Sequence, residues 1–305
     1  ACRIYTCRRS TDYRSGRRPD SLEANPPTKG KDMSEDVTTR SERGLDVLRT
    51  LGGSAEAAKG MGEYFENLGA VGQIALRVGA GEVWGRTALS RRDRSLAVIS
   101  FLTGLGREVE LRAHIAGGMN HGLRAEEIDE IFVQIGAYAG LPFALAGAGI
   151  ANEVIAQREG GARRKTPPAP LEAKDPARRR ADGLDLLKTL LGLPNLDTKA
   201  TEQQILASQG AMGELVMDYA FGDVWTRPAL SRRDRSFIVI SVLAALNMVH
   251  ELEIHLQGAL NHGVTKPEIE EMLLTLAVYG GFPRAIEGLR TAHKVCGRAG
   301  AGRTP

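Results

Sequence analysis

Two segments of this 305-residue chain are copies of each other, 141 residues apart. Residues 81–148 align without a gap on residues 222–289, and 32 of the 68 aligned positions are identical. Self-similarity at a fixed spacing is the signature of a tandem duplication, in which each copy is one supersecondary unit. The chain is therefore expected to fold as two related halves.

Each copy keeps a glutamate followed four residues later by a histidine, although more than half of the aligned positions differ. The pairs are Glu110 with His114 and Glu251 with His255. Residues four apart share one face of a helix, so the two side chains of a pair can touch. A carboxylate that holds a histidine raises its basicity and fixes its tautomer, as a proton-transfer group near neutral pH requires. We therefore expect two acid/base centres, in which the histidines donate protons or stabilise an oxyanion and the glutamates orient them.

The patterning within each copy is helical. In the first copy Ser90 stands three residues before Asp93, a spacing typical of a helix start, and the long apolar run at 96–105 indicates a buried central helix. The helix that carries the first Glu/His pair is expected to end before Gly122, and a later helix to open with Pro142. The second copy repeats these signals, and no alternating β pattern occurs. The sequence predicts an all-α fold.

The duplication also predicts the domain organisation. Residues 33–157 and 179–297 are expected to form one domain each, with separate cores. The segment 158–178 holds the densest cluster of proline and arginine and indicates a solvated linker. Residues 1–32 lack apolar periodicity, which is typical of a disordered extension, and residues 298–305 form a tail.

Composition excludes several classes of function. The net charge is only +3, and much of the basic excess lies outside the copies, which argues against nucleic-acid binding. The three cysteines also fall outside the copies and offer no disulfide framework, so we expect a reducing, cytoplasmic setting. No apolar run reaches the roughly eighteen residues of a membrane span, and no secretory signal is present, so no membrane partner is expected.

The strings around the repeated pairs resemble a known family. The second copy reads DVWTRPALS at 223–231 and YGGFP at 279–283, and both copies contain RDRS, Glu-Leu-x-x-His and Asn-x-Gly. These motifs resemble the carboxymuconolactone decarboxylase family, which shares its all-helical fold with the alkylhydroperoxidase D proteins. The resemblance implies two tandem alkylhydroperoxidase D-like helical domains. Because single-domain members form rings, it also implies a homo-oligomer, which we expect to be a trimer of six repeats.

The resemblance further implies a carboxy-lyase that acts on a small carboxylated unsaturated lactone in aromatic-compound catabolism, in the β-ketoadipate pathway. Such a substrate is its own electron sink, because the electrons released with carbon dioxide flow to the lactone carbonyl. We therefore expect no cofactor and no metal. Guanidinium groups match carboxylates, and the candidates for binding the substrate are Arg86, Arg91, Arg94, Arg227, Arg232 and Arg235.

Two other functions stay open. The peroxidase branch of the family carries Cys-x-x-Cys-x-x-x-His, but Arg107 and Glu110 stand at the cysteine positions of the first copy. Met248 and Glu251 stand there in the second, which disfavours a peroxidoxin-like redox protein. The third alternative is a non-catalytic oligomeric module.

Each candidate residue also has a simpler interpretation. The Glu/His pairs can be solvated helical pairs, and the arginines can form surface ion pairs. His121 and His262 are expected to partner helix ends, and Trp84 and Trp225 to be core or interface anchors. A metal site from Glu110, His114 and His121 lacks a fourth ligand. Of the two copies, the second has the closer family strings and is the preferred active one.

Overall fold

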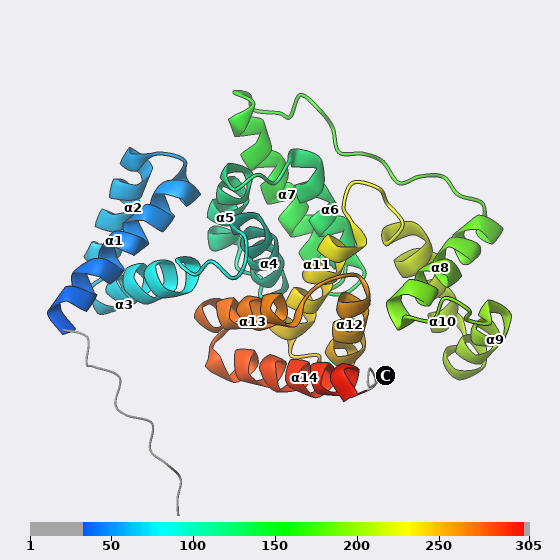
Figure 1. Ribbon diagram of the computed structural model, residues 1–305. Helices are drawn as coiled ribbons and strands as arrows, with labels where there is room; N and C mark the ends of the chain where they lie inside the picture. The colour runs from blue at the N-terminus through cyan, green and yellow to red at the C-terminus, as the bar shows by residue number, and fades with distance from the viewer. Residues whose placement is uncertain (1–32, 302–305) are drawn as a thin grey trace, which may run out of the picture.

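The computed structural model describes residues 33–301, which form helices joined by turns and loops and contain no strand, so the predicted all-α fold is confirmed (Figure 1). The elements are α1 (Met33–Gly52), α2 (Ala55–Asn67), α3 (Ala70–Ile74), η1 (Ala75–Trp84), α4 (Arg91–Gly104), α5 (Glu108–Asn120), α6 (Ala125–Gly136), α7 (Leu141–Arg158), α8 (Pro176–Leu191), α9 (Thr198–Gln209), α10 (Ala211–Leu215), η2 (Val216–Val224), α11 (Arg232–Leu246), α12 (Val249–Asn261), α13 (Lys266–Gly280) and α14 (Phe282–Ala301). The predicted N-terminal extension, 1–32, and the last four residues of the tail lie outside the described residues.

The local signals placed the main helices correctly. The Ser90 hydroxyl accepts a hydrogen bond from the backbone N–H of Asp93 at 3.0 Å, and α4 begins directly after it. The second copy repeats this cap at the start of α11. Helix α5 ends at Asn120, just before Gly122, and Pro142 lies in the first turn of α7. These boundaries follow from caps and breakers that act within a few residues.

Two π-helices, η1 and η2, were not foreseen, and each packs closely on the first long helix of its own half. A Cβ atom on Gly44 of α1 would lie 2.4 Å from the carbonyl oxygen of Leu76 in η1. A Cβ atom on Gly183 of α8 would lie 2.0 Å from the carbonyl oxygen of Met217 in η2. Only glycine allows backbones to approach this closely. The close approach fixes the path of each π-helix, and a buried tryptophan lies at its end: Trp84 is the last residue of η1 and Trp225 directly follows η2.

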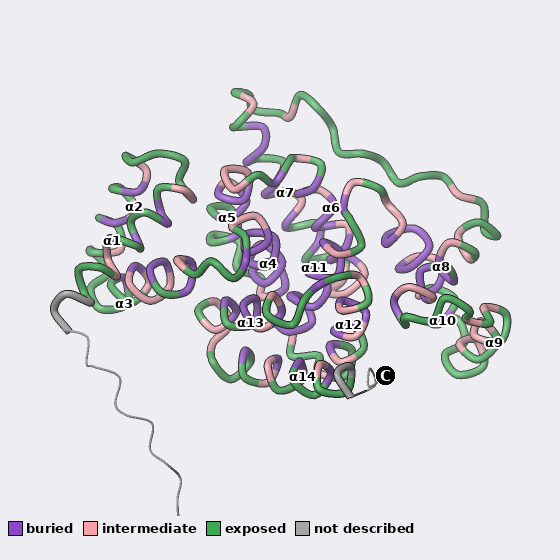
Figure 2. The backbone as a smooth tube through the Cα atoms, viewed as in Figure 1, coloured by how far each residue is buried: buried purple, intermediate pink, exposed green. Residues whose placement is uncertain are grey.

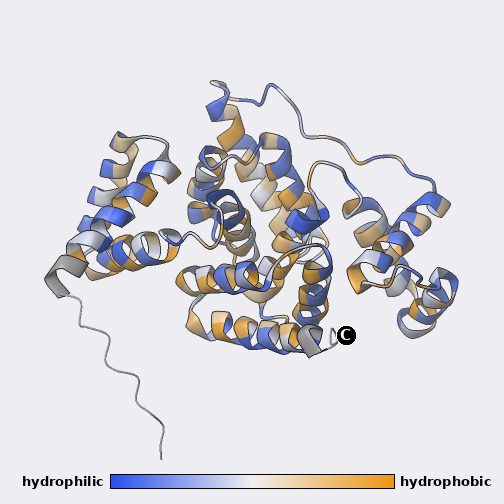
Figure 3. Ribbon diagram, in the orientation of Figure 1, coloured by the Kyte–Doolittle hydropathy of each residue, from blue (hydrophilic) through white to orange (hydrophobic). Residues whose placement is uncertain are grey.

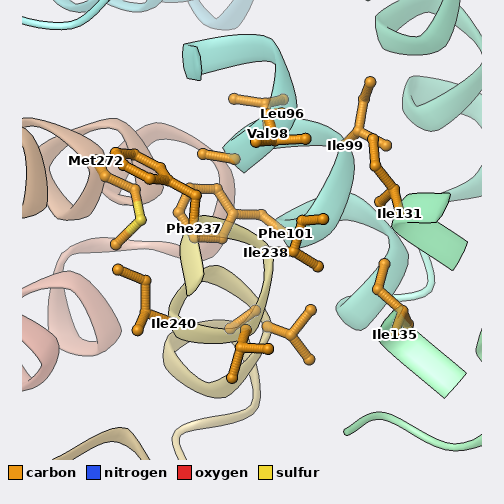
Figure 4. Close-up of a cluster of buried hydrophobic side chains, with 14 of the residues drawn as sticks. Leu96, Val98, Ile99, Phe101, Ile131, Ile135, Phe237, Ile238, Ile240 and Met272 are labelled. Atoms are coloured by element: carbon orange, nitrogen blue, oxygen red, sulfur yellow. The ribbon is translucent and has the colours of Figure 1, made fainter. Parts of the chain in front are cut away.

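The two halves share one hydrophobic core, so the prediction of separate cores was wrong. Helices α4 and α11 lie side by side at the centre, α13 packs on α4, and α6 packs on α11. Figure 4 shows Phe101 of the first half beside Phe237 of the second, and both are fully buried. The buried residues accordingly concentrate where the halves meet (Figure 2). Apolar surface that an isolated repeat would expose is covered by its partner repeat.

The helices α1 to α3 and α8 to α10 lie on opposite sides of this central body (Figure 1). The connection between α7 and α8 runs over the outside, is mostly exposed and is largely hydrophilic (Figure 3). Its two ends are nevertheless anchored, because Arg164 pairs with Asp129 at 2.7 Å and Lys174 pairs with Asp182 at 2.7 Å. None of the helices in the described range combines the length and apolar character that would let it cross a bilayer.

Candidate active site

His114 lies at the boundary between the two repeats. It projects from α5 toward the core and is only 9% exposed. Its ring stacks on Trp84, with the ring centroids 5.6 Å apart, and its Nε2 atom lies 3.1 Å from the Tyr279 hydroxyl. Trp84 Nε1–H donates a hydrogen bond to the same hydroxyl at 2.8 Å. Three side chains therefore fix one another in a buried polar cluster.

This cluster is built from both repeats. Trp84 and His114 belong to the first repeat, but Tyr279 comes from α13 of the second. The second cluster has the reverse composition, since Tyr138 of the first repeat reaches the tryptophan and histidine of the second. We call these clusters the His114 site (Trp84, His114, His121 and Tyr279) and the His255 site (Trp225, His255, His262 and Tyr138). Neither repeat alone contains a complete site.

The His255 site is less tightly joined than the His114 site. Trp225 Nε1–H donates to the Tyr138 hydroxyl at 2.7 Å, and the ring of Tyr138 meets that of His255 edge to face at 5.0 Å. Among the described residues, no hydrogen bond links these two rings. Tyr138 lies in a turn after the end of α6, whereas Tyr279 lies within α13. The different backbone path explains why the two tyrosines approach their histidines differently.

His121 and His262 lie at the C-terminal ends of α5 and α12, as predicted, and their rings also pack in the two clusters. His121 packs on Trp84 with centroids 5.7 Å apart. Its Nδ1 lies 2.8 Å from the Ser95 hydroxyl and its Nε2 lies 3.1 Å from the Thr50 hydroxyl. His262 makes the corresponding contacts with Trp225, Ser236 and Thr189. Each of these histidines thus packs against the tryptophan of its site.

The site histidines are neutral at pH 7. Burial, and to a smaller extent the neighbouring His121, lowers the pKa of His114 to about 4. Burial and His262 do the same for His255. Burial also raises the pKa of Tyr279 and Tyr138 well above 10. The raised histidine basicity expected from the sequence is therefore reversed, because desolvation disfavours the imidazolium and no carboxylate contacts it.

Glu110 and Glu251 do not hold the histidines. Both glutamates are exposed on the outer sides of α5 and α12. Among the residues that the structure describes, none is a hydrogen-bond partner of His114 Nδ1, and its Nε2 contacts the Tyr279 hydroxyl. An ionised carboxylate retains its hydration by pointing outward, while the imidazole beside it is covered by the tryptophan. The group that orients His114 is thus Tyr279 of the other repeat.

Four of the six predicted arginines pair with a buried glutamate of the other repeat. Glu271 accepts hydrogen bonds from Arg94 Nη2 at 2.9 Å and from Arg86 Nε at 2.7 Å. Burial alone would raise the pKa of Glu271, but these two guanidinium groups hold it below its usual value. Glu130 receives Arg227 and Arg235 in the same way. These arginines are committed to the interface, so the structure does not support their predicted role in binding substrate.

Arg91 and Arg232, the other two, lie beside the sites. After burial, the charge of Arg91 is the second cause that lowers the pKa of His121 to about 4, and Arg232 acts likewise on His262. Arg232 Nη1 donates to the Thr189 hydroxyl at 2.7 Å. Arg91 Nη1 is buried without a hydrogen-bond partner.

Comparison with known proteins places these residues in a family. The sequence profile of the carboxymuconolactone decarboxylase family matches residues 70–153 and 210–294, more than half of the chain. The chain belongs to the carboxymuconolactone decarboxylase family. The two matched ranges contain every tryptophan, histidine and tyrosine of the two sites.

Two relatives within the carboxymuconolactone decarboxylase family are similar over parts of the chain. The 4-carboxymuconolactone decarboxylase of Acinetobacter baylyi is 42% identical over 77 residues, which are 25% of this chain and 58% of that protein. The nitrosuccinic acid decarboxylase of Metarhizium robertsii is 34% identical over 113 residues, 37% of this chain and 78% of that protein. The chain thus spans less than two thirds of the Acinetobacter protein.

Neither the His114 site nor the His255 site contains a cysteine. Cys296 is the one cysteine among the described residues; it lies on α14, and burial raises the pKa of its thiol. Within residues 33–301, no three His, Cys, Asp or Glu side chains lie close enough together to hold a metal ion.

Sequence reasoning missed the tyrosines as site residues. Tyr279 was part of a family string, and the tryptophans were seen only as anchors. Their recurrence at the 141-residue spacing, together with the histidines, was the available signal. No local pattern in the sequence predicts that each tyrosine contacts the tryptophan and histidine of the other repeat.

Proposed function

We propose that the protein is a cofactor-independent decarboxylase of the 4-carboxymuconolactone type, which acts on a small carboxylated unsaturated lactone. The observation that carries the proposal is the neutral, buried His114 held by Tyr279 and Trp84. Both relatives described above are named decarboxylases, which supports the same class of reaction.

The hydrogen-bond directions in the His114 site supply a donor. Trp84 Nε1–H can only donate, so the Tyr279 oxygen accepts from it and its own proton is free for His114 Nε2. With Nε2 as acceptor, the neutral imidazole carries its hydrogen on Nδ1. That atom is buried and has no partner. The hydrogen bonds from Trp84 to Tyr279 and from Tyr279 to His114 thus leave the Nδ1–H group of His114 as a donor for a substrate oxygen.

This donor fits the electronic demand of the reaction. When the bond to the carboxylate breaks, its electron pair enters the conjugated double bond and moves to the lactone carbonyl oxygen. A preorganised N–H in a water-poor site stabilises such a charge, and removing one donor of this kind typically costs about 3–4 kcal/mol of transition-state stabilisation. The carbon then takes up one proton, so each turnover releases one carbon dioxide and consumes one proton.

The direct test is turnover. Purified protein mixed with 4-carboxymuconolactone should lower the ultraviolet absorbance of the substrate and release an equal amount of carbon dioxide. A double variant that lacks both histidines, His114→Ala with His255→Ala, is the matched control and should lose this activity. Absence of turnover at high enzyme concentration would contradict the proposal.

A further inference from the structure

The two sites differ in buried polar atoms that have no partner. Among the described residues, His114 Nδ1 and Arg91 Nη1 are fully covered and have no hydrogen-bond partner, whereas Arg232 is exposed and the ring nitrogens of His255, which also lack a hydrogen bond, are not fully covered. A buried polar group without a partner costs roughly 1–3 kcal/mol and needs an explanation. The unpartnered Nε atoms of Arg94 and Arg235 recur in both repeats within ion pairs, so they are part of the interface. The unmatched pair of nitrogens therefore sets the His114 site apart.

The repeats differ in what holds the arginine. In the second repeat, Arg232 Nη1 donates to Thr189 at 2.7 Å and its Nη2 lies 4.0 Å from Asp185. In the first repeat, the corresponding aspartate, Asp46, accepts a hydrogen bond from Arg49 at 2.7 Å. The corresponding threonine contacts His121 and not Arg91. Within residues 33–301, Arg91 Nη1 is therefore a charged donor without a hydrogen-bond acceptor, and Asp46 acts on this arginine only through its charge.

Arg91 belongs to the same cluster as His114. It is the first residue of α4, and Ser95, one turn further along that helix, contacts His121. The ring of His121 packs on Trp84, whose indole also stacks on His114. The charge of Arg91 acts on His121, whose ring packs on the same tryptophan as His114, so Arg91 and His114 are neighbours of one tryptophan-centred cluster. An anionic ligand with acceptor oxygens can use both, since each can donate a hydrogen bond.

We propose that the His114 site is the one that binds the carboxylated substrate, with Arg91 as the anchor for a carboxylate, and that the His255 site binds it weakly because Arg232 is exposed and already donates to Thr189. The proposal rests on the proposed function for the class of ligand. It reverses the preference for the second copy that the sequence suggested. Arg91 is then a specificity-determining residue, because it selects substrates that carry a carboxylate.

The chain provides its own reporters for a test. Its two tryptophans lie one in each site, so Trp225→Phe leaves Trp84 as the reporter of the His114 site, and Trp84→Phe leaves Trp225 as that of the other. The probe is the ring-saturated analogue of 4-carboxymuconolactone, which keeps the carboxylates but lacks the conjugated double bond and cannot decarboxylate. We expect a saturable change in fluorescence in the Trp225→Phe protein and a much weaker response in the Trp84→Phe protein.

The arginines are then compared in the Trp225→Phe background, with helix content checked by circular dichroism. Arg91→Gln should raise the Kd of the probe at least tenfold, and Arg232→Gln should change it less than twofold. The inference would be overturned if Trp84 fluorescence did not respond to the probe, or if the two substitutions changed the Kd equally. Tighter probe binding in the Trp84→Phe protein than in the Trp225→Phe protein would also overturn it. Turnover of the unsaturated lactone is measured separately: Arg91-dependent binding without turnover would contradict the proposed function alone, and turnover that is indifferent to Arg91→Gln would contradict this inference alone.

Discussion

His114 stays neutral because it is buried against Trp84, and its neutrality decides what the residue can do. Burial lowers the pKa of the imidazole to about 4, so at pH 7 it has one N–H donor and one acceptor nitrogen. In the tautomer that we propose, the Tyr279 hydroxyl donates to Nε2 and the Nδ1–H group is left for a ligand. In this proposal the residue acts as a neutral hydrogen-bond donor rather than as an imidazolium.

The lowered histidine pKa predicts that activity persists to an unusually low pH. An ordinary histidine would lose its neutral form near pH 6.5, but the turnover of this protein should hold to well below pH 6 and fall only as the pH approaches about 4. A steady-state pH profile with an acid midpoint near 6.5 would contradict this prediction.

The same shift predicts how stability changes with pH. Because the unfolded state binds the proton more tightly, stability is fully present above about pH 6.5 and is lost as the pH falls through about 4. The loss amounts to roughly 3 kcal/mol for each of His114 and His255, which are both almost fully buried. Urea unfolding at several pH values measures it, and His114→Gln should remove part of the dependence.

At the scale of helices, the ion pairs across the repeats are the contacts that are costly to break. Glu271 on α13 is 3% exposed and binds Arg94 of α4 as well as Arg86. Replacing Glu271 with Gln removes the charge and leaves a buried guanidinium uncompensated, which should destabilise the protein by roughly 3–5 kcal/mol. Glu287→Gln, which disturbs an exposed pair with Arg290, is the control and should cost less than about 1 kcal/mol. Equal effects on the unfolding free energy would refute this assignment.

Helix positions were predictable from the sequence where the signal is local. The Ser90 cap, the end of α5 before Gly122 and the Pro142 start of α7 each depend on a few neighbouring residues. The π-helices were not predictable, because they depend on the close approach of a distant helix at Gly44 or Gly183. An apolar run identifies a buried helix but does not say which surface covers it.

The same limit explains the errors in the candidate site. An arginine such as Arg94 suits a substrate carboxylate and a buried glutamate of the other repeat equally well, and only the tertiary structure shows that it meets Glu271. The spacing of Glu110 and His114 was compatible with contact, but packing turned one inward and left the other in solvent. The spacing also named His114 and His255 as candidate site residues, but it did not name Tyr279, which contacts His114 from 165 residues further along the chain.

For the whole molecule, the duplication produces one body with two pseudo-equivalent sites. Each repeat covers apolar residues of the other and contributes a tyrosine to the other repeat's site. Because both copies are in one chain, the two sites can differ in sequence, as Arg91 and Arg232 do in their surroundings.

The homo-oligomer expected from the sequence remains a proposal. The starts of α7 and α14 expose apolar side chains at corresponding positions, Leu141 and Leu145 in one repeat and Phe282 and Ile286 in the other. Contiguous exposed apolar residues often mark contact surfaces. Light scattering should give about three times the chain mass of 32.8 kDa, and a monomer at micromolar concentration would reject the proposal.

The most direct test of the central claim, that each site is assembled from both repeats, uses two double variants. His255→Ala with Tyr138→Phe removes two residues of the His255 site and should keep turnover of 4-carboxymuconolactone within about threefold of the unmodified protein. His255→Ala with Tyr279→Phe damages both sites and should lower turnover at least about a hundredfold, the usual scale for losing a positioned proton-transfer or hydrogen-bonding group. If each repeat carried its own site, the second variant would leave the first repeat intact, and the reverse order of activities would contradict the account.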